Sequence, residues 1–355
     1  MTQISLDYLI IGQGLAGSLL AWELMQRGYK VLVVDNGQES ASQVAAGLIN
    51  PITGMRLVKA AEVDQQLSMA KRYYQHLSTF FKQPFYIEKP MLRIFKSQAE
   101  VNYGLKRLQE PSYQAFIERI NPSDAFFNTP VTQLGSLEQK QTGYLLTRNL
   151  LSCLKAFFIA QASYRQGSVS LDELQFQPEL HWHGVYPKQI IFCDGHQAQH
   201  NPLFSWLPFQ LVKGEILTLE YQGHLPDKIL NFGDWLIPLN ERHLRLGATF
   251  DRENVDTQPT ETAKGALLNS LAQILPDLPP TRLASHQANI RPCTLDKLPF
   301  IGHHPQYSQL SIFNGFGAKG SLQIPIYAQQ FAAALASNSP SPSNIQRYYA
   351  THFTG

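Results

Sequence analysis

The chain has 355 residues, of which 16% are charged and 44% are hydrophobic, and its formal net charge is only +2. This composition argues against a disordered chain and against a strongly basic nucleic-acid-binding surface, and the length suffices for two domains. No apolar run reaches the roughly eighteen residues that span a bilayer, no secretory signal precedes the first strand, and the three cysteines are widely spaced. We therefore expect a cytoplasmic protein with reduced thiols that binds small molecules.

The N-terminal segment contains the strongest pattern in the chain. An apolar strand at residues 9–11 is followed by a glycine turn with the spacing GxGxxG, a helix that stops near Gly28, and a second strand, residues 31–34, closed by Asp35. The turn glycines are Gly12, Gly14 and Gly17. In such a turn the first glycine permits a tight bend, the second lets the backbone approach a pyrophosphate, and the third lets the helix pack on the strand. An acid at the end of the second strand suits an adenosine ribose, so the unit predicts a dinucleotide site without separating NAD from FAD.

The next segments depart from this alternation of strand and helix. Residues 44–56 are rich in small side chains, so their backbone could lie close to a flat ligand, with an ordinary loop as the alternative. An amphipathic helix is predicted at 62–81, and one or two strands interrupted by proline at 84–97. Two further helices are predicted at 99–108 and 114–120. We interpret this block as an insertion into the dinucleotide-binding fold.

The alternation resumes at residue 143 and is interrupted again near residue 211. We expect a helix at 148–162, followed by two strand-like runs at 169–176 and 179–185. A parallel strand at 189–192 ends before Gly195. Antiparallel β-structure at 211–249 and another helix at 262–275 follow. His181 and His183 alternate in one run and could share a metal, but two half-exposed strand residues are the favoured interpretation. The antiparallel stretch is the second insertion, and with the first it would form a substrate domain above the cofactor domain.

The C-terminal third holds a second glycine-rich turn. Residues 286–302 suggest turns and short strands around Arg291 and Asp296, and residues 310–337 suggest a strand, a glycine turn and a helix. Asp296 could orient Arg291 or cap the following turn, and the turn is favoured. A second helix N-terminus at a glycine turn gives the fold a second positive dipole end, which a nicotinamide dehydrogenase does not need, so the pattern favours a flavin.

These motifs together resemble the D-amino-acid oxidase and glycine oxidase (DAO) family of FAD-dependent oxidoreductases over nearly the whole chain. The segments that carry the resemblance occur in the order of the family; they are GQGLAG with Asp35, AAGLINP, IIFCDG, KGEILTLE, WLIPLNERHLRLGAT, IRPCTLDKLPFIG and NGFGAKG. The GFGAKG segment is also similar to the flavin domain of bifunctional tRNA wobble-uridine enzymes. We expect an α/β fold, α+β overall, in which a mainly antiparallel substrate domain (61–142 and 211–288) is inserted into a Rossmann-like FAD-binding domain (1–60, 143–210 and 289–355).

The resemblance assigns roles to particular positions. Arg291 falls on the arginine that grips the substrate carboxylate, and Trp235 stands where amino-acid oxidases commonly place a tyrosine. Asp35 replaces the usual glutamate, and Ala318 stands where glycine oxidases show an arginine. The residues expected at a non-covalent FAD are Gly12, Gly14, Leu15, Ala16, Gly17, Asp35, Asn36, Ala46, Gly47, Gly195, Arg291, Gly315, Phe316, Gly317, Ala318, Lys319 and Gly320.

The predicted activity is oxidation of a carbon–nitrogen bond in an amino acid or N-substituted amino acid, with hydride transfer to FAD and hydrolysis of the resulting imine. One alternative is a flavoprotein that trims an amino-acid-like substituent from a wobble uridine of tRNA. The near-neutral charge and the lack of a methyltransferase domain argue against it. A third alternative is a non-catalytic NAD-binding or regulatory module. No metal site is expected.

Overall fold

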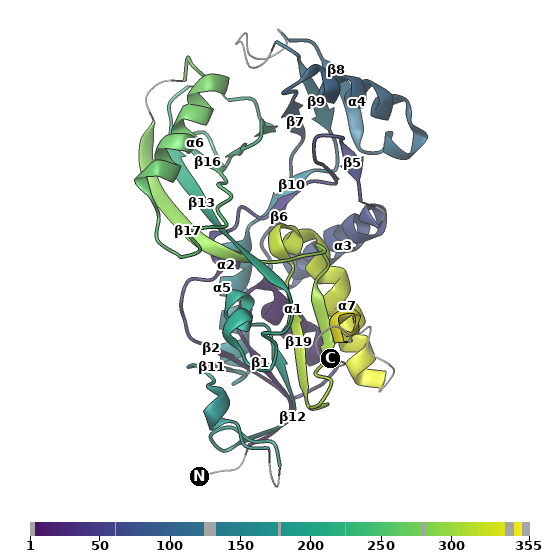
Figure 1. Cartoon of the computed structure of the whole chain (residues 1–355), viewed down its shortest axis with the longest axis vertical. Coiled ribbons are helices and arrows are strands. Elements are labelled where there is room, and N and C mark those ends of the chain that lie inside the picture. Colours follow the sequence, from purple (N-terminus) through teal and green to yellow (C-terminus); the bar gives the residue numbers. More distant parts are fainter. Residues whose placement is uncertain are drawn as a thin grey trace.

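A computed structural model of the chain describes seven stretches, residues 4–60, 62–123, 133–176, 179–223, 225–278, 281–337 and 344–349. They form two units stacked along the long axis of the molecule (Figure 1). The lower unit is built on a mainly parallel sheet, and the upper unit on a large, mainly antiparallel sheet. None of the helices in these stretches combines the length and the apolar character needed to cross a bilayer.

The lower sheet has six strands within the described residues, in the order β11–β2–β1–β12–β19–β18. Neighbouring strands run parallel, except that β18 is antiparallel to β19. Helices cover one face of this sheet, and 3-10 turns and loops around Leu180, Phe204 and Ile345 cover the other, so its central strands are buried on both faces, which explains their uninterrupted apolar runs. The strands are β1 (Ile4–Ile11), β2 (Val31–Asp35), β11 (Tyr164–Gln166), β12 (Val185–Phe192), β18 (Phe300–His303) and β19 (Leu310–Asn314).

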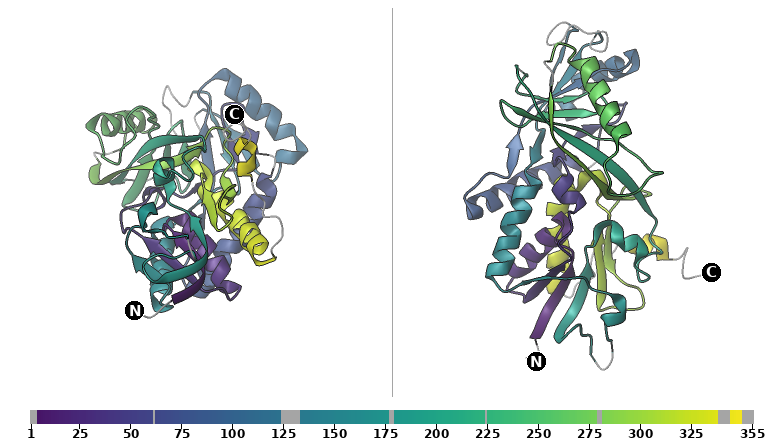
Figure 2. Two further views of the ribbon diagram at one scale, coloured as in Figure 1. Left: turned by 60° about the horizontal axis from the view of Figure 1, so that its bottom comes forward. Right: turned by 90° about the vertical axis from the view of Figure 1, so that its left-hand side faces the viewer.

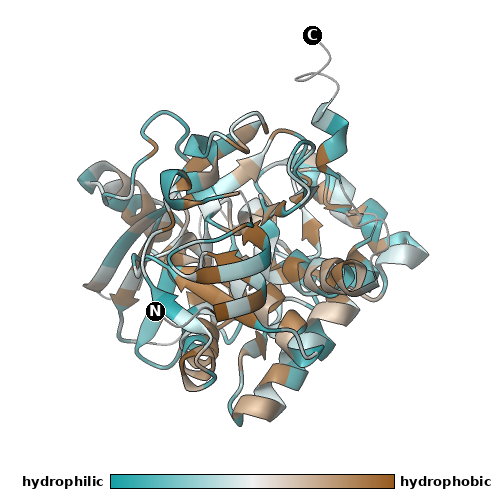
Figure 3. Cartoon of the chain, turned by 90° about the horizontal axis from the view of Figure 1, so that it is seen from below, coloured by the Kyte–Doolittle hydropathy of each residue, from teal (hydrophilic) through white to brown (hydrophobic). Residues whose placement is uncertain are grey.

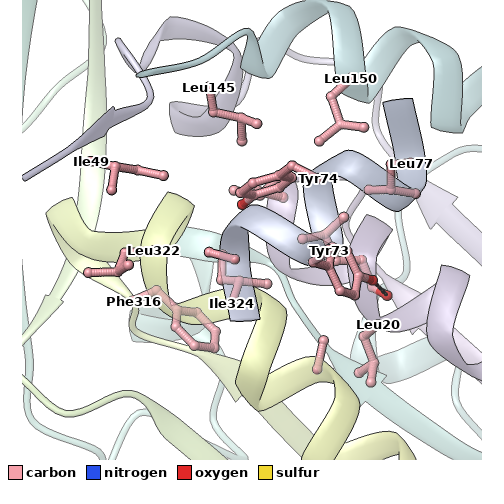
Figure 4. Packing of buried hydrophobic residues seen from close by; sticks show 14 of the residues in the cluster. Leu20, Ile49, Tyr73, Tyr74, Leu77, Leu145, Leu150, Phe316, Leu322 and Ile324 are labelled. Carbon is pink, nitrogen blue, oxygen red and sulfur yellow. Dashed lines mark hydrogen bonds between the residues drawn. The ribbon is translucent and has the colours of Figure 1, made fainter. Parts of the chain in front are cut away.

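Four helices bury the principal core of the lower unit, namely α1 (Leu15–Gln26), α3 (Val63–Phe81), α5 (Thr147–Ala160) and α7 (Gly320–Ser337). Figure 4 shows how their side chains meet, with Leu20 of α1, Tyr74 of α3, Leu150 of α5 and Ile324 of α7 in one cluster. The hydroxyl of Tyr74 donates to the carbonyl of Ser321, 2.7 Å away, and so ties α3 to the first turn of α7. Figure 3 shows the hydrophobic strands at the centre of this unit.

The upper sheet has eight strands in the part of the chain that is described, in the order β17–β13–β16–β15–β14–β7–β9–β8, and its pairs are antiparallel except for β14 with β7. Helix α6 (Glu261–Ile274) packs on it through Leu267 and Leu271, and α4 (Gln98–Gln109) lies beside β8. The strands are β7 (Met91–Ile94), β8 (Ile117–Asn121), β9 (Ser136–Gln139), β13 (Phe209–Glu220), β14 (Ile229–Asn231), β15 (Trp235–Pro238), β16 (His243–Gly247) and β17 (Arg282–Thr294).

Two long strands, β13 and β17, reach from the upper sheet down to the lower unit, as the right-hand view of Figure 2 shows. Small elements fill the junction between the units. They are α2 (Ala41–Val44), the sheet of β3 (Leu48–Ile49), β10 (Gly143–Leu145) and β6 (Tyr86–Glu88), and the hairpin of β4 (Ile52–Thr53) and β5 (Val58–Lys59). Short 3-10 turns complete the described chain at Pro111–Tyr113, Leu171–Glu173, Gly195–His200, Gly317–Lys319 and Ile345–Tyr348.

Three sequence-based expectations for individual elements are wrong. The helix expected at 114–120 is largely strand β8, because pairing with β9 overrides the local pattern. The strand-like runs at 169–176 and 179–185 form a 3-10 turn and isolated bridges, so His181 and His183 do not share a regular strand. Of the turns and short strands expected at 286–302, residues 286–294 instead belong to the long strand β17, which tolerates Pro292 because it lies at the edge of its sheet. The turn at 295–299 and the short strand β18 that follows it agree with the expectation.

The proposed domain boundaries can be placed on these elements. The boundary at residue 289 falls inside β17, and the boundary at residue 211 falls inside β13. Helix α3, which was assigned to the substrate domain, packs against α7 of the lower unit. The division into two discontinuous domains therefore remains a proposal.

Candidate active site

A cavity of about 1140 Å³ runs between the two units. Its lower wall is formed by the loops that follow β1, β2, β12 and β19 of the parallel sheet, and its upper wall by β13, β14, β15 and β17. Ligands of open α/β sheets bind outside the carboxyl ends of the strands, where this lower wall lies. The cavity therefore connects a nucleotide-type site to the face of the upper sheet.

The three glycines of the first turn have different surroundings. Gly12 has a φ of +104°, and a β-carbon there would lie 2.5 Å from the carbonyl oxygen of Cys193. A β-carbon on Gly17 would lie 2.0 Å from the carbonyl oxygen of Gly12, so Gly17 is required for packing of α1 on the turn. Gly14 has nothing nearer than the hydroxyl of Ser42, at 3.5 Å, and it lines the cavity. It is thus the glycine whose backbone a ligand can approach.

Asp35 lies at the end of β2 and lines the cavity beside Asn36. One of its carboxylate oxygens accepts from the backbone N–H of Gln13 and the other from that of Gly37, each at 2.8 Å. These bonds fix the carboxylate against the first turn. A carboxylate has about four lone-pair sites, so both oxygens can still accept from a ribose hydroxyl.

The second glycine-rich turn leads from β19 into α7. A β-carbon on Gly315 would lie 2.7 Å from the methyl group of Thr294, so this glycine serves packing, and it does not line the cavity. The residues after it do, so the start of α7 lies in the wall of the same cavity. Lys319 has no ion pair among the described residues. The turn is therefore an electropositive end of the cavity.

The Ala46–Gly47 segment is held by the junction sheet and by the upper sheet. Gly47 has a φ of +69°, and a β-carbon there would lie 2.1 Å from the carbonyl oxygen of Leu145. From the upper sheet, the guanidinium of Arg245 donates to the carbonyls of Ala45 and Val44, each at 3.1 Å. Burial lowers the pKa of Arg245 from its ordinary value. Sequence reasoning missed this arginine, although a cation at an inward position of a β-strand is a detectable signal.

Arg291 reaches the cavity from β17. Its guanidinium lies over Gly214, where a β-carbon would be 2.0 Å from Nη2, and Nη1 donates to the carbonyl of Thr249 at 3.2 Å. No described carboxylate pairs with it, and burial lowers the pKa of Arg291 from its ordinary value. Asp296 is elsewhere engaged, since it accepts from the N–H of Leu298 in its own turn and pairs with Arg347 at 2.6 Å. The expectation that Asp296 belongs to the turn is confirmed.

A row of side chains crosses the upper wall. Trp235 lies over Gly247, where a β-carbon would be 2.8 Å from the indole ring. Asn231 pairs with Trp235 across β14 and β15, and Arg93 pairs with Asn231 across β7 and β14. Arg93, Asn231 and Trp235 all line the cavity. Arg93 and Asn231 were not found from the sequence, because a short strand with one buried polar residue has no distinctive local pattern.

Asp194 follows β12 and is another lining residue that the sequence did not single out. Its carboxylate accepts from the side-chain amide of Asn314 at 3.2 Å. Burial raises the pKa of Asp194 to about 7. Its α-carbon lies 3.3 Å from where a β-carbon on Gly12 would stand, so Asp194 adjoins the first turn. The neighbouring Gly195 also lines the cavity, as expected.

The structure thus brings most of the predicted site residues to one cavity. Gly17 and Gly315 lie behind its wall, as packing positions. Among the described residues, no group of three His, Cys, Asp or Glu side chains could hold a metal ion. The predicted residues that line the cavity are Gly12, Gly14, Leu15, Ala16, Asp35, Asn36, Ala46, Gly47, Gly195, Trp235, Arg291, Phe316, Gly317, Ala318, Lys319 and Gly320.

Comparison with known proteins identifies a family of flavoenzymes and several similar proteins. Residues 7–334 match the model of the family described as FAD dependent oxidoreductase (DAO). The chain is 29% identical to a glycine oxidase of Pseudomonas putida, over 95% of this chain and 96% of that protein. It is 23% identical to the tRNA 5-methylaminomethyl-2-thiouridine biosynthesis bifunctional protein MnmC of Acinetobacter baylyi, over 95% of this chain and 54% of that protein. The crystal structure of glycine oxidase from Geobacillus kaustophilus has a TM-score of 0.81 at 19% identity, covering 99% of this chain and 100% of that one.

Proposed function

Because this chain belongs to the family of FAD-dependent oxidoreductases, we propose that it oxidises the carbon–nitrogen bond of an amino acid or an N-substituted amino acid. FAD, when bound, supplies the hydride acceptor. The similarity to glycine oxidases supports an amino-acid substrate. The observation that carries the proposal is Arg291, a half-buried guanidinium without a described carboxylate partner in the wall of the cavity.

The cavity has the features that FAD requires. Gly14 leaves open space at the N-terminus of α1 for the diphosphate, and Asp35 presents a fixed carboxylate for the adenosine ribose. The start of α7, with Lys319, would hold the negative charge that collects on the reduced flavin ring. We propose non-covalent binding, because burial raises the pKa of Cys193, a cavity-lining thiol, well above its ordinary value and makes it a poor nucleophile.

Arg291 would bind the substrate carboxylate. A guanidinium that is partly removed from water is stabilised by an anion and by hydrogen bonds, and Arg291 has only one described hydrogen bond, to a neutral carbonyl. Its planar fork matches a carboxylate in a bidentate pair. Because Gly214 has no side chain, the guanidinium can lie flat against β13 and leave the space beside Trp235 for the rest of the substrate.

The protein groups near the proposed substrate do not include a base. Of the described residues that line the cavity from the upper sheet, none is an acid or a histidine. The substrate would therefore bind with its amine unprotonated. The chain's contribution is then placement, with Arg291 fixing one end of the substrate and Trp235 excluding water from one side.

The proposal is tested by reducing the bound flavin under anaerobic conditions with an amino acid and with its decarboxylated amine. In Arg291→Ala the carboxylate loses its partner, which should cost about 2–5 kcal/mol, or at least about thirty-fold in apparent affinity for the acid. Arg291→Lys should recover only part of this loss, because lysine keeps the charge but not the fork.

Arg282→Ala is the matched control. Arg282 lies on the same strand, is exposed, and pairs with Glu220 at the surface, so its loss should leave both substrates unaffected. If Arg291→Ala lost activity toward the acid and the amine equally, or lost its flavin, the carboxylate assignment would be wrong.

A second candidate function follows from the similarity to the bifunctional tRNA-modifying proteins, which covers nearly all of this chain but about half of theirs. An amino-acid-like substituent on a wobble uridine would also present an amine to the flavin. Flavin reduction by bulk tRNA, without reduction by free amino acids, would favour this candidate.

A further inference from the structure

We propose that the substrate carries, besides its carboxylate, a neutral hydrogen-bond acceptor that binds the side-chain NH2 of Asn231 at the far end of the upper wall. This inference rests on the proposed function and specifies its substrate class. The substrate would be an amino acid whose nitrogen or side chain is extended by a chain ending in an amide, a ring carbonyl or a similar group. Free glycine has no such group.

The register of the upper sheet puts the relevant residues in one row. Arg93 of β7 pairs with Asn231 of β14, Asn231 pairs with Trp235 of β15, and Trp235 pairs with Gly247 of β16, which in turn pairs with Ile216 of β13. Directly paired residues project from the same face of a sheet. Consistent with this, Arg93, Asn231, Trp235 and Ile216 all line the cavity. The row therefore forms a continuous wall from Arg93 toward β13.

The orientation of the Asn231 amide follows from its partner. Nη1 of Arg93 lies 3.1 Å from the side-chain oxygen of Asn231, and because arginine can only donate, the amide oxygen must face it. The NH2 group is left without a partner in the described chain. Arg93 is itself fixed by Glu100, 2.9 Å from Nη2, and only 2% of Glu100 is exposed. Asn231 is 9% exposed and lines the cavity, so its NH2 group is a donor from which a ligand in the cavity can accept a hydrogen bond.

The charge of this end favours a neutral acceptor over a second carboxylate. The ion pair between Arg93 and Glu100 leaves no net charge beside Asn231. A further cation is Lys96, whose amine lies beside Gly233, but Lys96 is exposed to solvent, which screens its charge. A carboxylate at Asn231 would thus lose its hydration without gaining a buried counter-charge.

The dimensions of the sheet show that a substrate as small as glycine cannot contact Arg291 and Asn231 at the same time. Arg291 lies over Gly214 of β13, and Asn231 belongs to β14, three strands away in the sheet. Neighbouring strands are about 4.8 Å apart, so the two backbones are separated by about 14 Å. Even with both side chains reaching inward, a ligand needs a chain of several atoms between its carboxylate and its acceptor. The indole of Trp235 and the side chain of Ile216 supply an apolar wall for that chain.

The test uses the FAD-loaded enzyme and glycines N-substituted with chains of matched lengths that end in a carboxamide, an isopropyl group or a carboxylate. Flavin reduction is followed anaerobically, with glycine as reference. At the best length, the carboxamide should exceed the isopropyl compound by about ten-fold in kcat/KM, mainly through KM. Asn231→Ala should remove this preference, so that the carboxamide and isopropyl compounds have about the same kcat/KM in the variant. Asn231→Asp, which replaces the donor with an acceptor, should remove it as well.

Asn121→Ala is the control for loss of a buried amide from the same sheet, because the side-chain NH2 of Asn121 donates a hydrogen bond to the hydroxyl of Ser136 and Asn121 does not line the cavity. It should keep the wild-type preference even if its stability falls. The inference would be overturned if the compounds with the three terminal groups reacted at equal rates, or if Asn231→Ala still preferred the carboxamide. Either result would leave the proposed function standing. If no carboxylate-bearing amine reduced the flavin, both would be refuted.

Discussion

Substitution of two glycines in the first turn should separate cofactor binding from packing. Gly14→Ala places a methyl group where the nearest protein atom is 3.5 Å away, an ordinary contact, and the φ of −70° at Gly14 suits alanine. The apoprotein should lose at most about 1 kcal/mol, the cost of alanine at an N-cap. The methyl group occupies the approach of the diphosphate, so FAD affinity should fall at least about ten-fold, or about 1.4 kcal/mol.

Gly17→Ala should have the opposite effect. Alanine in a helix interior gains about 1 kcal/mol over glycine, but the new methyl group would lie 2.0 Å from the carbonyl oxygen of Gly12 and 3.1 Å from the β-carbon of Cys193. Because the nearer neighbour is backbone, α1 must move by roughly 1 Å, and overpacking of this kind costs about 1–3 kcal/mol or more. We expect a net loss of about 2 kcal/mol, and a fall of about 3 °C in the Tm of the apoprotein.

The assay combines thermal unfolding of FAD-free protein with fluorescence titration of FAD into each variant. The wild-type apoprotein is the reference for Tm, and a Gly265→Ala variant controls for replacement of a helix glycine by alanine, because Gly265 lies inside α6 with no neighbour within 4 Å. The reasoning would be refuted if Gly14→Ala lowered Tm as much as Gly17→Ala, or if Gly14→Ala bound FAD with wild-type affinity.

Two further predictions concern residues that only the structure revealed. Burial raises the pKa of Asp194 to about 7, so its carboxyl is neutral below that pH and negative above it; FAD affinity should therefore weaken as pH rises through 7, and Asp194→Asn should flatten this dependence in titrations on either side of pH 7. A wild-type affinity independent of pH would contradict this. Arg245→Met frees the carbonyls of Val44 and Ala45, so kcat should fall roughly ten- to hundred-fold and the visible circular dichroism of the flavin should change. Arg148→Gln, which removes only an exposed pair with Glu39, should change neither.

Local sequence patterns were sufficient for the cofactor half of the site. The turn at Gly12–Gly17, the acid at Asp35 and the second turn before α7 are each defined within a few residues, because steric limits on glycine and hydrogen bonding at a helix start are local effects. For the same reason the helices near 62–81, 148–162 and 262–275 were predicted close to their observed bounds. Most of the residues that were predicted for the site, including those around the two glycine turns, line one cavity.

The substrate half depended on contacts between distant parts of the chain. Arg93 and Asn231 are 138 residues apart, and Arg245 and Ala45 are 200 apart, so no local pattern shows that these groups meet. Strands β8 and β17 were likewise misassigned, because pairing with β9 and β13 decided their conformation. The sequence by itself thus determined the two glycine turns and the acid that form the proposed dinucleotide site. Only the register of the upper sheet decided which side chains face it, because a shift of one residue in a strand would turn each of them to the other face.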